Sequence, residues 1–194
     1  MFVYSQKQFL SILNVTEDWK GNTLLDLGAG DGKVTEIMAP FFTRVYVTEV
    51  SSVMTSKLSK MDYRVLDPFL WLDEQENFDV ITCLNLLDRC STPLTLLSQL
   101  KTKLTPVTGR LIVALVIPCS QYVETGGKSH EPDEYLKIQG NSFETQINSF
   151  VKNVLSPMGF EVETWSRVPY LCEGDLVQSY FWLIDALFVL KVSA

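Results

Sequence analysis

The chain is poor in histidine and lacks paired cysteine motifs. His130 is the only histidine among 194 residues, and the four cysteines form no Cys-x-x-Cys pair. Zinc sites are usually built from several such ligands at short spacing, so we expect no metal ion. A Ser-His-Asp or Cys-His nucleophile is equally disfavoured, because His130 falls in a polar loop. We expect the cysteines to be free thiols in a reducing compartment.

Long apolar runs and excess positive charge are also missing. No apolar stretch approaches the roughly 18 residues of a membrane span, and no basic-then-apolar leader opens the chain. The 16 Lys and Arg residues are outnumbered by 23 Asp and Glu residues, which gives a net charge of −7. Sequence-independent binding to nucleic acid requires the opposite balance. We therefore expect an intracellular, cytoplasmic protein without a membrane span or a nucleic-acid partner.

The length suits one domain with a full hydrophobic core. Internal repeats and low-complexity segments are absent from the sequence. We therefore expect a single domain over residues 1–194, and a monomer.

A glycine-rich turn follows the first apolar run. Residues 24–32 read LLDLGAGDG, an apolar strand followed by a turn that leads into a helix. In an open α/β sheet, such a turn lets the backbone approach a nucleotide. A dinucleotide fingerprint would place a glycine at position 33, where this chain has a lysine. The turn is therefore predicted to bind a nucleotide that lacks a pyrophosphate.

Acidic side chains around this turn indicate the kind of ligand. Asp26 and Asp31 would repel a phosphate, but they suit a cationic or zwitterionic group. Glu49 lies 21 residues after Gly28, where Rossmann-type domains place a carboxylate for the ribose hydroxyls. S-adenosylmethionine combines an amino-acid end, a sulfonium and a ribose, so we expect this cofactor, with S-adenosylhomocysteine as its product. The alternative is a turn that needs glycine only for its backbone conformation.

Apolar periodicity predicts strands and helices in alternation. The expected strands cover residues 23–28, 44–50, 63–66, 78–85, 109–117, 160–169 and 180–191. The expected helices lie within 1–20 and over 31–39, 51–60, 92–104 and 143–154.

This order predicts an α/β fold with a seven-stranded, mostly parallel sheet, the Rossmann-like plan of class I methyltransferases. No helix separates the final two strands, so the last strand must run antiparallel. The helical segment at 1–20 is expected to pack on the sheet edge. The polar segment 118–141 is too long for a plain connection, so we expect a lid, a substrate loop or a disordered insert.

In such a sheet a ligand binds beyond the carboxyl ends of the strands. The ends of the first two strands carry residues 26–31 and Glu49, which are predicted to hold the methionine and the ribose. Leu66 and Asp67 end the third strand and are predicted to cover the adenine.

Polar residues after the fourth strand are predicted to face the methyl group and the substrate. Asn85 and Asp88 occupy this place. For Asp88 and Arg89, the alternative is a helix-capping acid with a surface salt bridge. The segment 169–175 reads PYLCEGD and is expected to connect the last two strands above the site entrance. Its spacing is equally compatible with a substrate-binding role and with a plain turn.

Several segments resemble a known methyltransferase family. They are FVYS (2–5), LLDLGAGDGKVT (24–35), CLNLLDRC (83–90), PLTLL (93–97), GRLIVALVIP (109–118), GGK (126–128) and PYLCEGD (169–175). Together they resemble the DREV methyltransferase-like family of protein-histidine N-pros-methyltransferases. The resemblance covers nearly the whole chain. Segments 83–90 and 169–175 are more specific than the glycine turn, which many methyltransferases share.

The resemblance implies methylation of histidine in His-x-His motifs, where x is small. Such motifs occur in His-rich proteins that handle or transport zinc. Family members usually carry an additional N-terminal segment with targeting character. The resemblance therefore adds the endoplasmic reticulum and the mitochondrion to the compartments to consider.

Strand ends and the resemblance together give the expected site. The cofactor-binding set is Asp26, Gly28, Ala29, Gly30, Asp31, Glu49, Leu66, Asp67 and Asn85. The resemblance implies that Asn85, Asp88 and Tyr170 hold the substrate imidazoles, and these three form the expected catalytic set. Arg89 and Tyr4 are further substrate-binding candidates.

Imidazole chemistry is compatible with these roles. The ring is a good nucleophile only when it is neutral, and its reference pKa is ~6.5. A neutral ring has one N–H and one lone pair, so an acceptor for the N-tau hydrogen leaves N-pros free to attack. The oxygen of Asn85 or the carboxylate of Asp88 can be that acceptor. The sequence does not decide which of the two takes the target ring.

Two other functions are compatible with the sequence. The first is a methyltransferase for a small metabolite, with segments 118–141 and 169–175 closed over a small pocket. The second is a scaffold that binds S-adenosylmethionine without turnover. The polar Asn85 and Asp88 disfavour the scaffold.

Overall fold

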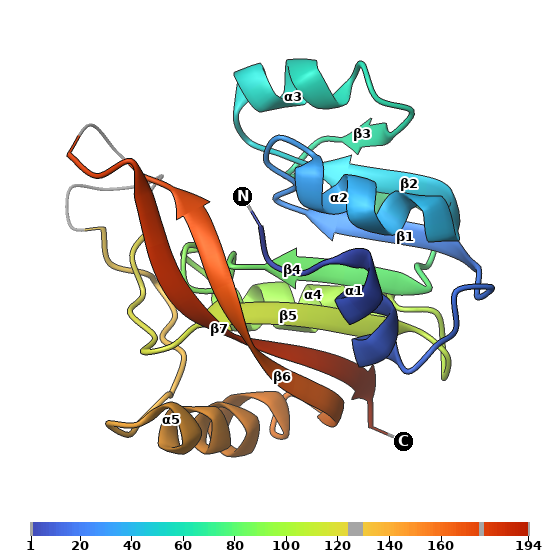
Figure 1. Cartoon of the computed structure of the whole chain (residues 1–194). Helices are drawn as coiled ribbons and strands as arrows, with labels where there is room; N and C mark the ends of the chain where they lie inside the picture. The colour runs from blue at the N-terminus through green and yellow to red at the C-terminus, as the bar shows by residue number, and fades with distance from the viewer. Residues whose placement is uncertain (1, 124–129, 175–176, 194) are drawn as a thin grey trace.

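The computed structural model describes residues 2–123, 130–174 and 177–193. Its centre is a seven-stranded sheet in the order β3-β2-β1-β4-β5-β7-β6 (Figure 1). The strands are β1 (Gly21–Leu27), β2 (Phe42–Thr48), β3 (Arg64–Leu66), β4 (Val80–Leu84), β5 (Arg110–Val116), β6 (Phe160–Glu173) and β7 (Tyr180–Val192). The last strand, β7, is antiparallel to both of its neighbours, and the pairs among β1 to β5 are parallel. The predicted fold class is confirmed.

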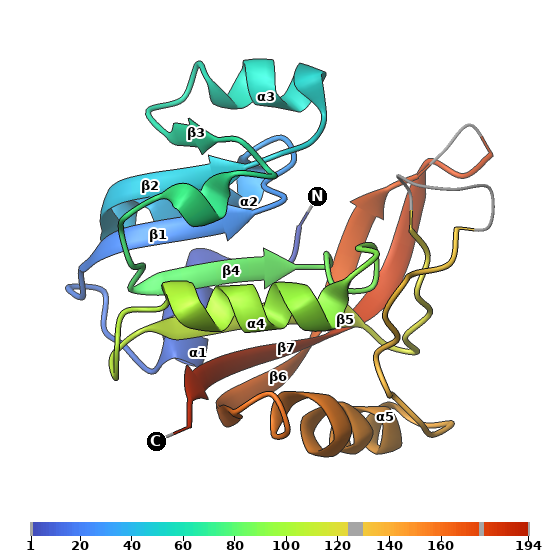
Figure 2. The same ribbon diagram turned by 180° about the vertical axis from the view of Figure 1, so that it is seen from behind.

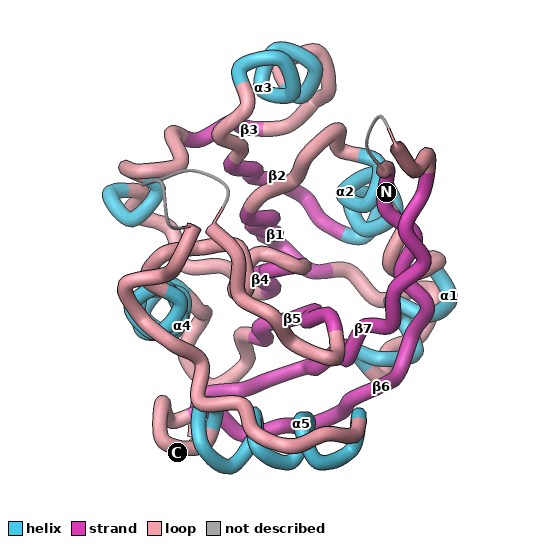
Figure 3. Tube along the Cα trace, turned by 90° about the vertical axis from the view of Figure 1, so that its left-hand side faces the viewer, coloured by secondary structure: helices cyan, strands magenta, loops and turns pink. Residues whose placement is uncertain are grey.

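Helices cover both faces of this sheet. They are α1 (Gln6–Leu13), α2 (Lys33–Met38), α3 (Ser52–Leu58), α4 (Pro93–Lys103) and α5 (Phe143–Phe150), with short 3-10 helices at Ala39–Phe41 and Trp71–Asp73 and a π-helix at Val151–Leu155. Figure 2 shows α4 and α5 on the face opposite α1 and α2. In the end-on view of Figure 3, α3 lies beyond the β3 end of the sheet. Pro40 lies in the first turn of a 3-10 helix, so α2 ends before it, as predicted.

The central strands are buried on both sides, as parallel strands between two helical layers must be. On the face of α4 and α5, Leu97, Phe150 and Phe188 belong to one apolar cluster. On the other face, Phe9 and Met38 belong to a second cluster. The sheet therefore separates two hydrophobic cores.

The first helix differs in detail from the expectation of a segment on the sheet edge. Phe9, Leu10 and Ile12 are buried along one side of α1, which packs against β6 and also against α2. It therefore covers part of a sheet face. Its start is fixed by Ser5, which forms a capping box with Gln8.

The terminal hairpin is longer than predicted. Residues 169–173 were expected to connect the last two strands, but they continue β6, with Pro169 opposite Ile184 and Cys172 opposite Phe181. Proline is tolerated here because β6 is the edge strand of the sheet. This correction places Tyr170 on a strand, where its position is fixed by pairing with Leu183.

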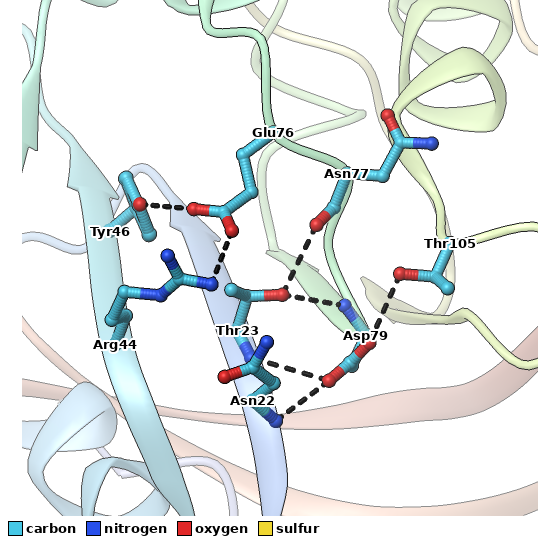
Figure 4. A network of polar contacts seen from close by, with 8 residues as sticks. All are labelled: Asn22, Thr23, Arg44, Tyr46, Glu76, Asn77, Asp79 and Thr105. Carbon is cyan, nitrogen blue, oxygen red and sulfur yellow. Dashed lines mark hydrogen bonds and ion pairs between the residues drawn. The ribbon is translucent and has the colours of Figure 1, made fainter.

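A polar network joins the amino ends of the central strands (Figure 4). The carboxylate of Asp79 accepts hydrogen bonds from Asn22 N–H at 2.7 Å, Thr23 N–H at 3.3 Å and Thr105 Oγ1 at 3.0 Å. Nearby, Glu76 accepts from Tyr46 and pairs with Arg44. These contacts connect β1 and β2 to the segment that precedes β4, and that segment to the loop after α4, at the sheet end opposite the strands' carboxyl ends.

We expect Asp79→Ala to lower the free energy of unfolding by about 2–4 kcal/mol, because three donors lose a charged acceptor. Urea unfolding followed by circular dichroism measures this loss. Affinity for S-adenosylhomocysteine, measured by calorimetry on the folded variant, should stay within twofold. A large loss of affinity would contradict a purely structural role.

Candidate active site

One cavity of about 870 Å³ lies at the carboxyl ends of the strands. Gly28 and Glu49 line one part of it, and Asn85 and Tyr170 line another. It therefore spans the point between β1 and β4 where the strand order reverses, which is where open α/β sheets bind ligands. Its volume is at the upper end of the range for ligand pockets, roughly 300–1,000 Å³. Such a cavity has room for a nucleoside cofactor and part of a second molecule.

The predicted glycine turn forms part of this wall. Gly28 and Gly30 both line the cavity and have positive φ angles of 68° and 57°, a conformation that disfavours other residues. A side chain at Gly32 would collide with the core, because its Cβ would lie 2.8 Å from Met61 Sδ. Ala29 is buried, and its N–H donates to the carbonyl of Thr48 at 3.0 Å.

Glu49 follows the last residue of β2 and lines the cavity. Its Oε2 accepts from Gly30 N–H and its Oε1 accepts from Ser51 N–H, both at 2.8 Å. Ser51 in turn caps α3. Each carboxylate oxygen keeps a further lone pair, so Glu49 can also accept hydrogen bonds from two vicinal hydroxyls. This is the geometry predicted for a ribose contact.

Asp26 has a different place from the other predicted cofactor residues. It is 2% exposed, and its two oxygens accept from Thr35 Oγ1 and Thr82 Oγ1, both at 2.6 Å. Burial raises the pKa of this carboxyl to about 6, although the two hydroxyls favour the charged form. The structure therefore shows Asp26 supporting the glycine turn from behind. Its direct contact with a cofactor stays a prediction.

Asp31 lines the cavity between two lysines. Its Oδ2 lies 3.3 Å from Lys57 Nζ and 3.4 Å from Lys33 Nζ. Partial burial opposes ionisation, but the Lys33 N–H and the ammonium groups of Lys57 and Lys33 outweigh it and hold the pKa of Asp31 below its usual range. This part of the cavity is therefore less acidic than two isolated acids would make it.

An adenine was expected at the end of β3. Apolar side chains from the segments that follow β2, β3 and β4 line this part of the cavity. They are Val50, Met54, Pro68, Trp71 and Leu86. Leu66 and Asp67 instead border a neighbouring shallow depression. The carboxylate of Asp67 accepts hydrogen bonds from the backbone N–H groups of Phe69 and Leu70. Their predicted adenine contact stays a prediction. Trp71 belongs to the apolar cluster on the α4 face of the sheet and also lines the cavity.

The substrate end of the cavity is built from the residues that follow β4. Asn85 has a φ of 53°, and its Nδ2 donates to Asp185 Oδ2 at 2.9 Å. Asp88 is 2% exposed, with Arg89 Nε 3.4 Å from its Oδ2. Thr92 occupies the N-cap position of α4, so Asp88 is not a helix-capping acid. The structure brings Asn85, Asp88, Arg89 and Tyr170 together in one cavity wall, as predicted.

These neighbouring groups influence one another's ionisation. Burial raises the pKa of Asp185 to about 7, and the charge of Asp88 adds to this effect. Burial also raises the pKa of Tyr170, with smaller contributions from Cys172, Asp185 and Asp88 that Arg89 opposes. Perturbed carboxyls beside a cavity are typical of functional sites.

Asp185 is a site residue that the sequence reasoning missed. It lies on β7 opposite Val116 and Val168, and it is 0% exposed. The available signal was a single acid within the apolar run 181–190. A buried carboxylate is costly without partners, so an acid in such a run indicates a specific contact.

Tyr4 is a correction to the predicted substrate set. It is fully buried, stacks on Phe9 at a ring-centroid distance of 5.8 Å, and donates from its hydroxyl to Met38 Sδ at 2.9 Å. A side chain enclosed in this core cannot reach a substrate, because α1 and α2 cover it. Tyr170, in contrast, lines the cavity.

The segment 118–141 is anchored to the substrate end in its described parts. Tyr122 N–H donates to the carbonyl of Asp88 at 2.8 Å, and Glu134 N–H donates to Ser91 O at 2.9 Å. The His130 ring stacks on Tyr122 and bonds to the carbonyl of Val123. The GGK motif, 126–128, lies outside the described residues. The role of this segment as a lid stays a prediction.

The chain has the Rossmann-like fold of class I methyltransferases, and several solved structures share this fold. The chain superposes on the CurJ carbon methyltransferase with a TM-score of 0.62 at 19% identity, covering 97% of this chain and 53% of that chain. Magnesium protoporphyrin IX methyltransferase from Synechocystis PCC 6803, solved with bound S-adenosylmethionine, gives 0.59 at 14%, covering 96% and 77%. The N-methyltransferase NodS from Bradyrhizobium japonicum WM9 gives 0.58 at 16%, covering 97% and 94%. Identities this low show a shared fold.

The sequence itself places the chain in a particular family. Residues 1–192 match the family described as DREV methyltransferase, so the protein belongs to that family. The expected methyltransferase class and its methyl donor, S-adenosylmethionine, are confirmed. The cavity fits this donor, because it offers the Glu49 carboxylate, the glycine turn and an apolar wall in one continuous space. When bound, the donor supplies a sulfonium-activated methyl group.

The described part of the chain contains no helix that is long and apolar enough to cross a membrane. Within those same residues, no group of three His, Cys, Asp or Glu side chains is placed to hold a metal ion. Burial raises the pKa of the Cys90 thiol, which lines the cavity, to about 11, so this thiol stays protonated at neutral pH.

We expect Glu49→Gln to weaken binding of S-adenosylhomocysteine by about tenfold or more, because a charged acceptor becomes neutral and one of its oxygens becomes a donor. Isothermal calorimetry measures the change. Glu36→Gln is the matched control, since Glu36 is an exposed acid on α2. Equal affinity in both variants would remove Glu49 from the cofactor site.

We expect the free energy of unfolding of Asp185→Asn to rise, relative to that of the unsubstituted protein, as the pH rises from about 4 to 7. In this window the folded protein keeps the Asp185 proton, whose pKa is about 7, while the unfolded chain has lost it near 3.8. The native state of the unsubstituted protein then binds more protons than its unfolded state, so its free energy of unfolding falls as the pH rises. Asp185→Asn has no carboxyl at this position and does not lose this stability. Urea unfolding at pH 5, 6 and 7 measures the difference. A constant difference would contradict the raised pKa.

Proposed function

We propose that the protein methylates the N-pros atom of histidine in His-x-His segments of His-rich proteins, zinc-transporting proteins among them. The proposal refines the methyltransferase activity of the family to one nucleophile and one substrate class. Membership in the DREV family and the polar group formed by Asn85, Asp88 and Tyr170 support it.

The observation that carries the proposal is the amide oxygen of Asn85. This Oδ1 is buried and accepts no hydrogen bond in the described structure, while the Nδ2 of the same amide is bonded to Asp185. An unsatisfied buried acceptor costs roughly 1–3 kcal/mol, so it is expected to be filled when a ligand binds. A neutral imidazole offers one N–H donor and one lone pair, and it therefore matches an acceptor beside a methyl donor.

The residues around Asn85 suit the handling of an imidazole. An acceptor on N-tau fixes the tautomer in which the N-pros lone pair is free. Methylation makes the ring cationic until N-tau releases its proton, and the carboxylate of Asp88 is a group that can stabilise this charge. Most of the rate enhancement in such a displacement comes from positioning.

The cavity also accommodates a neighbouring ring. It continues from Asn85 along the terminal hairpin, where Tyr170, Cys172 and Leu183 face it. Two imidazoles separated by one small residue can occupy two positions along such a wall, one at Asn85 and the other at Asp88.

We expect Asn85→Ala and Asp88→Ala each to lower methylation of a His-Ala-His peptide by at least about 100-fold, because the tautomer or the developing charge is no longer controlled. Mass spectrometry with labelled S-adenosylmethionine measures the product. Calorimetry with S-adenosylhomocysteine should show affinity within threefold of the unsubstituted protein for Asp88→Ala.

Peptide controls separate this function from the alternatives. An Ala-Ala-Ala version of the peptide should receive no label, and fragmentation should locate the methyl group on N-pros. A protein that binds the cofactor but labels neither peptide would contradict the proposal and leave small-molecule methylation or a non-catalytic role. Normal turnover in both variants would remove Asn85 and Asp88 from the mechanism.

A further inference from the structure

A single buried acid interrupts the apolar sequence of β7. Asp185 is 0% exposed, lies between β5 and β6 in the sheet, and is flanked in sequence by Ile184 and Ala186. Among the described residues, the side chain of Asn85 donates from Nδ2 to Asp185 Oδ2 at 2.9 Å, and the other carboxylate oxygen, Oδ1, accepts no hydrogen bond. Because burial of an acid with so few partners is unfavourable, its position needs a functional reason.

We propose that Asp185 is a positioning residue that fixes the amide of Asn85 with its nitrogen toward the sheet and its oxygen available to the substrate. An asparagine amide has a donor end and an acceptor end of nearly equal shape, and nothing steric distinguishes the two orientations. An ionised carboxylate accepts only, so Asp185 selects the donor end. The oxygen is then left as the acceptor that the proposed histidine methylation requires, and this part of the inference rests on that function.

Backbone geometry completes the restraint on Asn85. Its N–H donates to the carbonyl of Ala114 at 3.0 Å, and its φ of 53° places it at the point where the chain leaves β4. The backbone is therefore held by β5 and the side chain by β7. Asp185 does not line the cavity as Asn85 does, so it acts through Asn85 and is not itself a catalytic residue.

The charge state of Asp185 determines how firmly the amide is held. The ionisable groups that reach it are Asp88, which follows β4, and Tyr170 on β6, while Arg89 pairs with Asp88. A protonated Asp185 can donate to the amide oxygen and thereby permit the opposite orientation. The restraint is therefore strongest when the carboxyl is ionised.

A double-mutant cycle tests whether Asp185 acts through Asn85. Asp185→Asn keeps the shape but accepts either end of the Asn85 amide. With a His-Ala-His peptide, we expect its kcat to fall between about 10- and 100-fold, with KM and affinity for S-adenosylhomocysteine nearly unchanged. On an Asn85→Ala background, the same substitution should change the residual kcat less than twofold. Equal losses on both backgrounds, or normal kcat in Asp185→Asn, would overturn the proposal.

A second measurement does not depend on the substrate. The side-chain amide signals of Asn85, assigned by their loss in Asn85→Ala, should shift with pH in ¹⁵N NMR spectra of the full chain, and Asp185→Asn should abolish this titration. Signals that ignore both pH and Asp185→Asn would overturn the proposal. If the unsubstituted protein does not methylate the peptide, histidine methylation fails, but these spectra still decide whether Asp185 orients the amide.

The matched control is Asp79→Asn. Asp79 also accepts hydrogen bonds within the sheet, but it lies at the amino ends of the strands (Figure 4). It should lower stability without changing kcat of the folded protein or the Asn85 signals. If Asp79→Asn reduced kcat as much as Asp185→Asn, loss of general stability would explain both variants and the positioning role would be wrong.

Discussion

The cofactor end of the molecule depends on the buried carboxylate of Asp26. This residue belongs to β1, and its two oxygens bind the hydroxyls of Thr35 on α2 and Thr82 on β4. The glycine turn lies between Asp26 and Thr35, so the two ends of the turn are joined by a hydrogen bond that solvent does not reach. This contact fixes the shape of the turn, and Gly28, Gly30 and Glu49 line the cavity. The unfavourable burial of Asp26 is offset by the two short hydrogen bonds that its carboxylate accepts from Thr35 and Thr82.

The substrate end is organised by different means. Residues that follow β4 provide Asn85 and Asp88, but their surroundings come from β5, β7 and the described parts of segment 118–141. Asn85 and Asp185 are 100 residues apart in sequence. The cofactor half is thus built largely from one local β-α-β unit, whereas the substrate half needs the whole sheet to be assembled. This division is consistent with a common donor and a substrate specificity that belongs to the family.

The same division explains which features the sequence could predict. The glycine turn, Glu49 and the strand order follow from local patterns, and the structure has them where expected. Asp185 could not be placed because its role depends on the antiparallel register of β7 against β5, which no local pattern determines. Tyr4 was assigned to the substrate through family resemblance alone, and burial under α1 contradicts that role. The end of β6 was missed because Pro169 normally interrupts a strand, whereas an edge strand tolerates it.

The long hairpin of β6 and β7 contributes to the cavity wall, but it also places a long strand at the edge of the sheet. An edge strand of 14 residues offers a row of backbone groups to which another chain could add. Pro169 removes one of the donors on this strand, and Phe2 forms an isolated bridge to Leu171 close beside it. The edge is therefore interrupted where the hairpin passes the active site. An edge divided in this way is a poor template for growth of a shared sheet between copies of the chain.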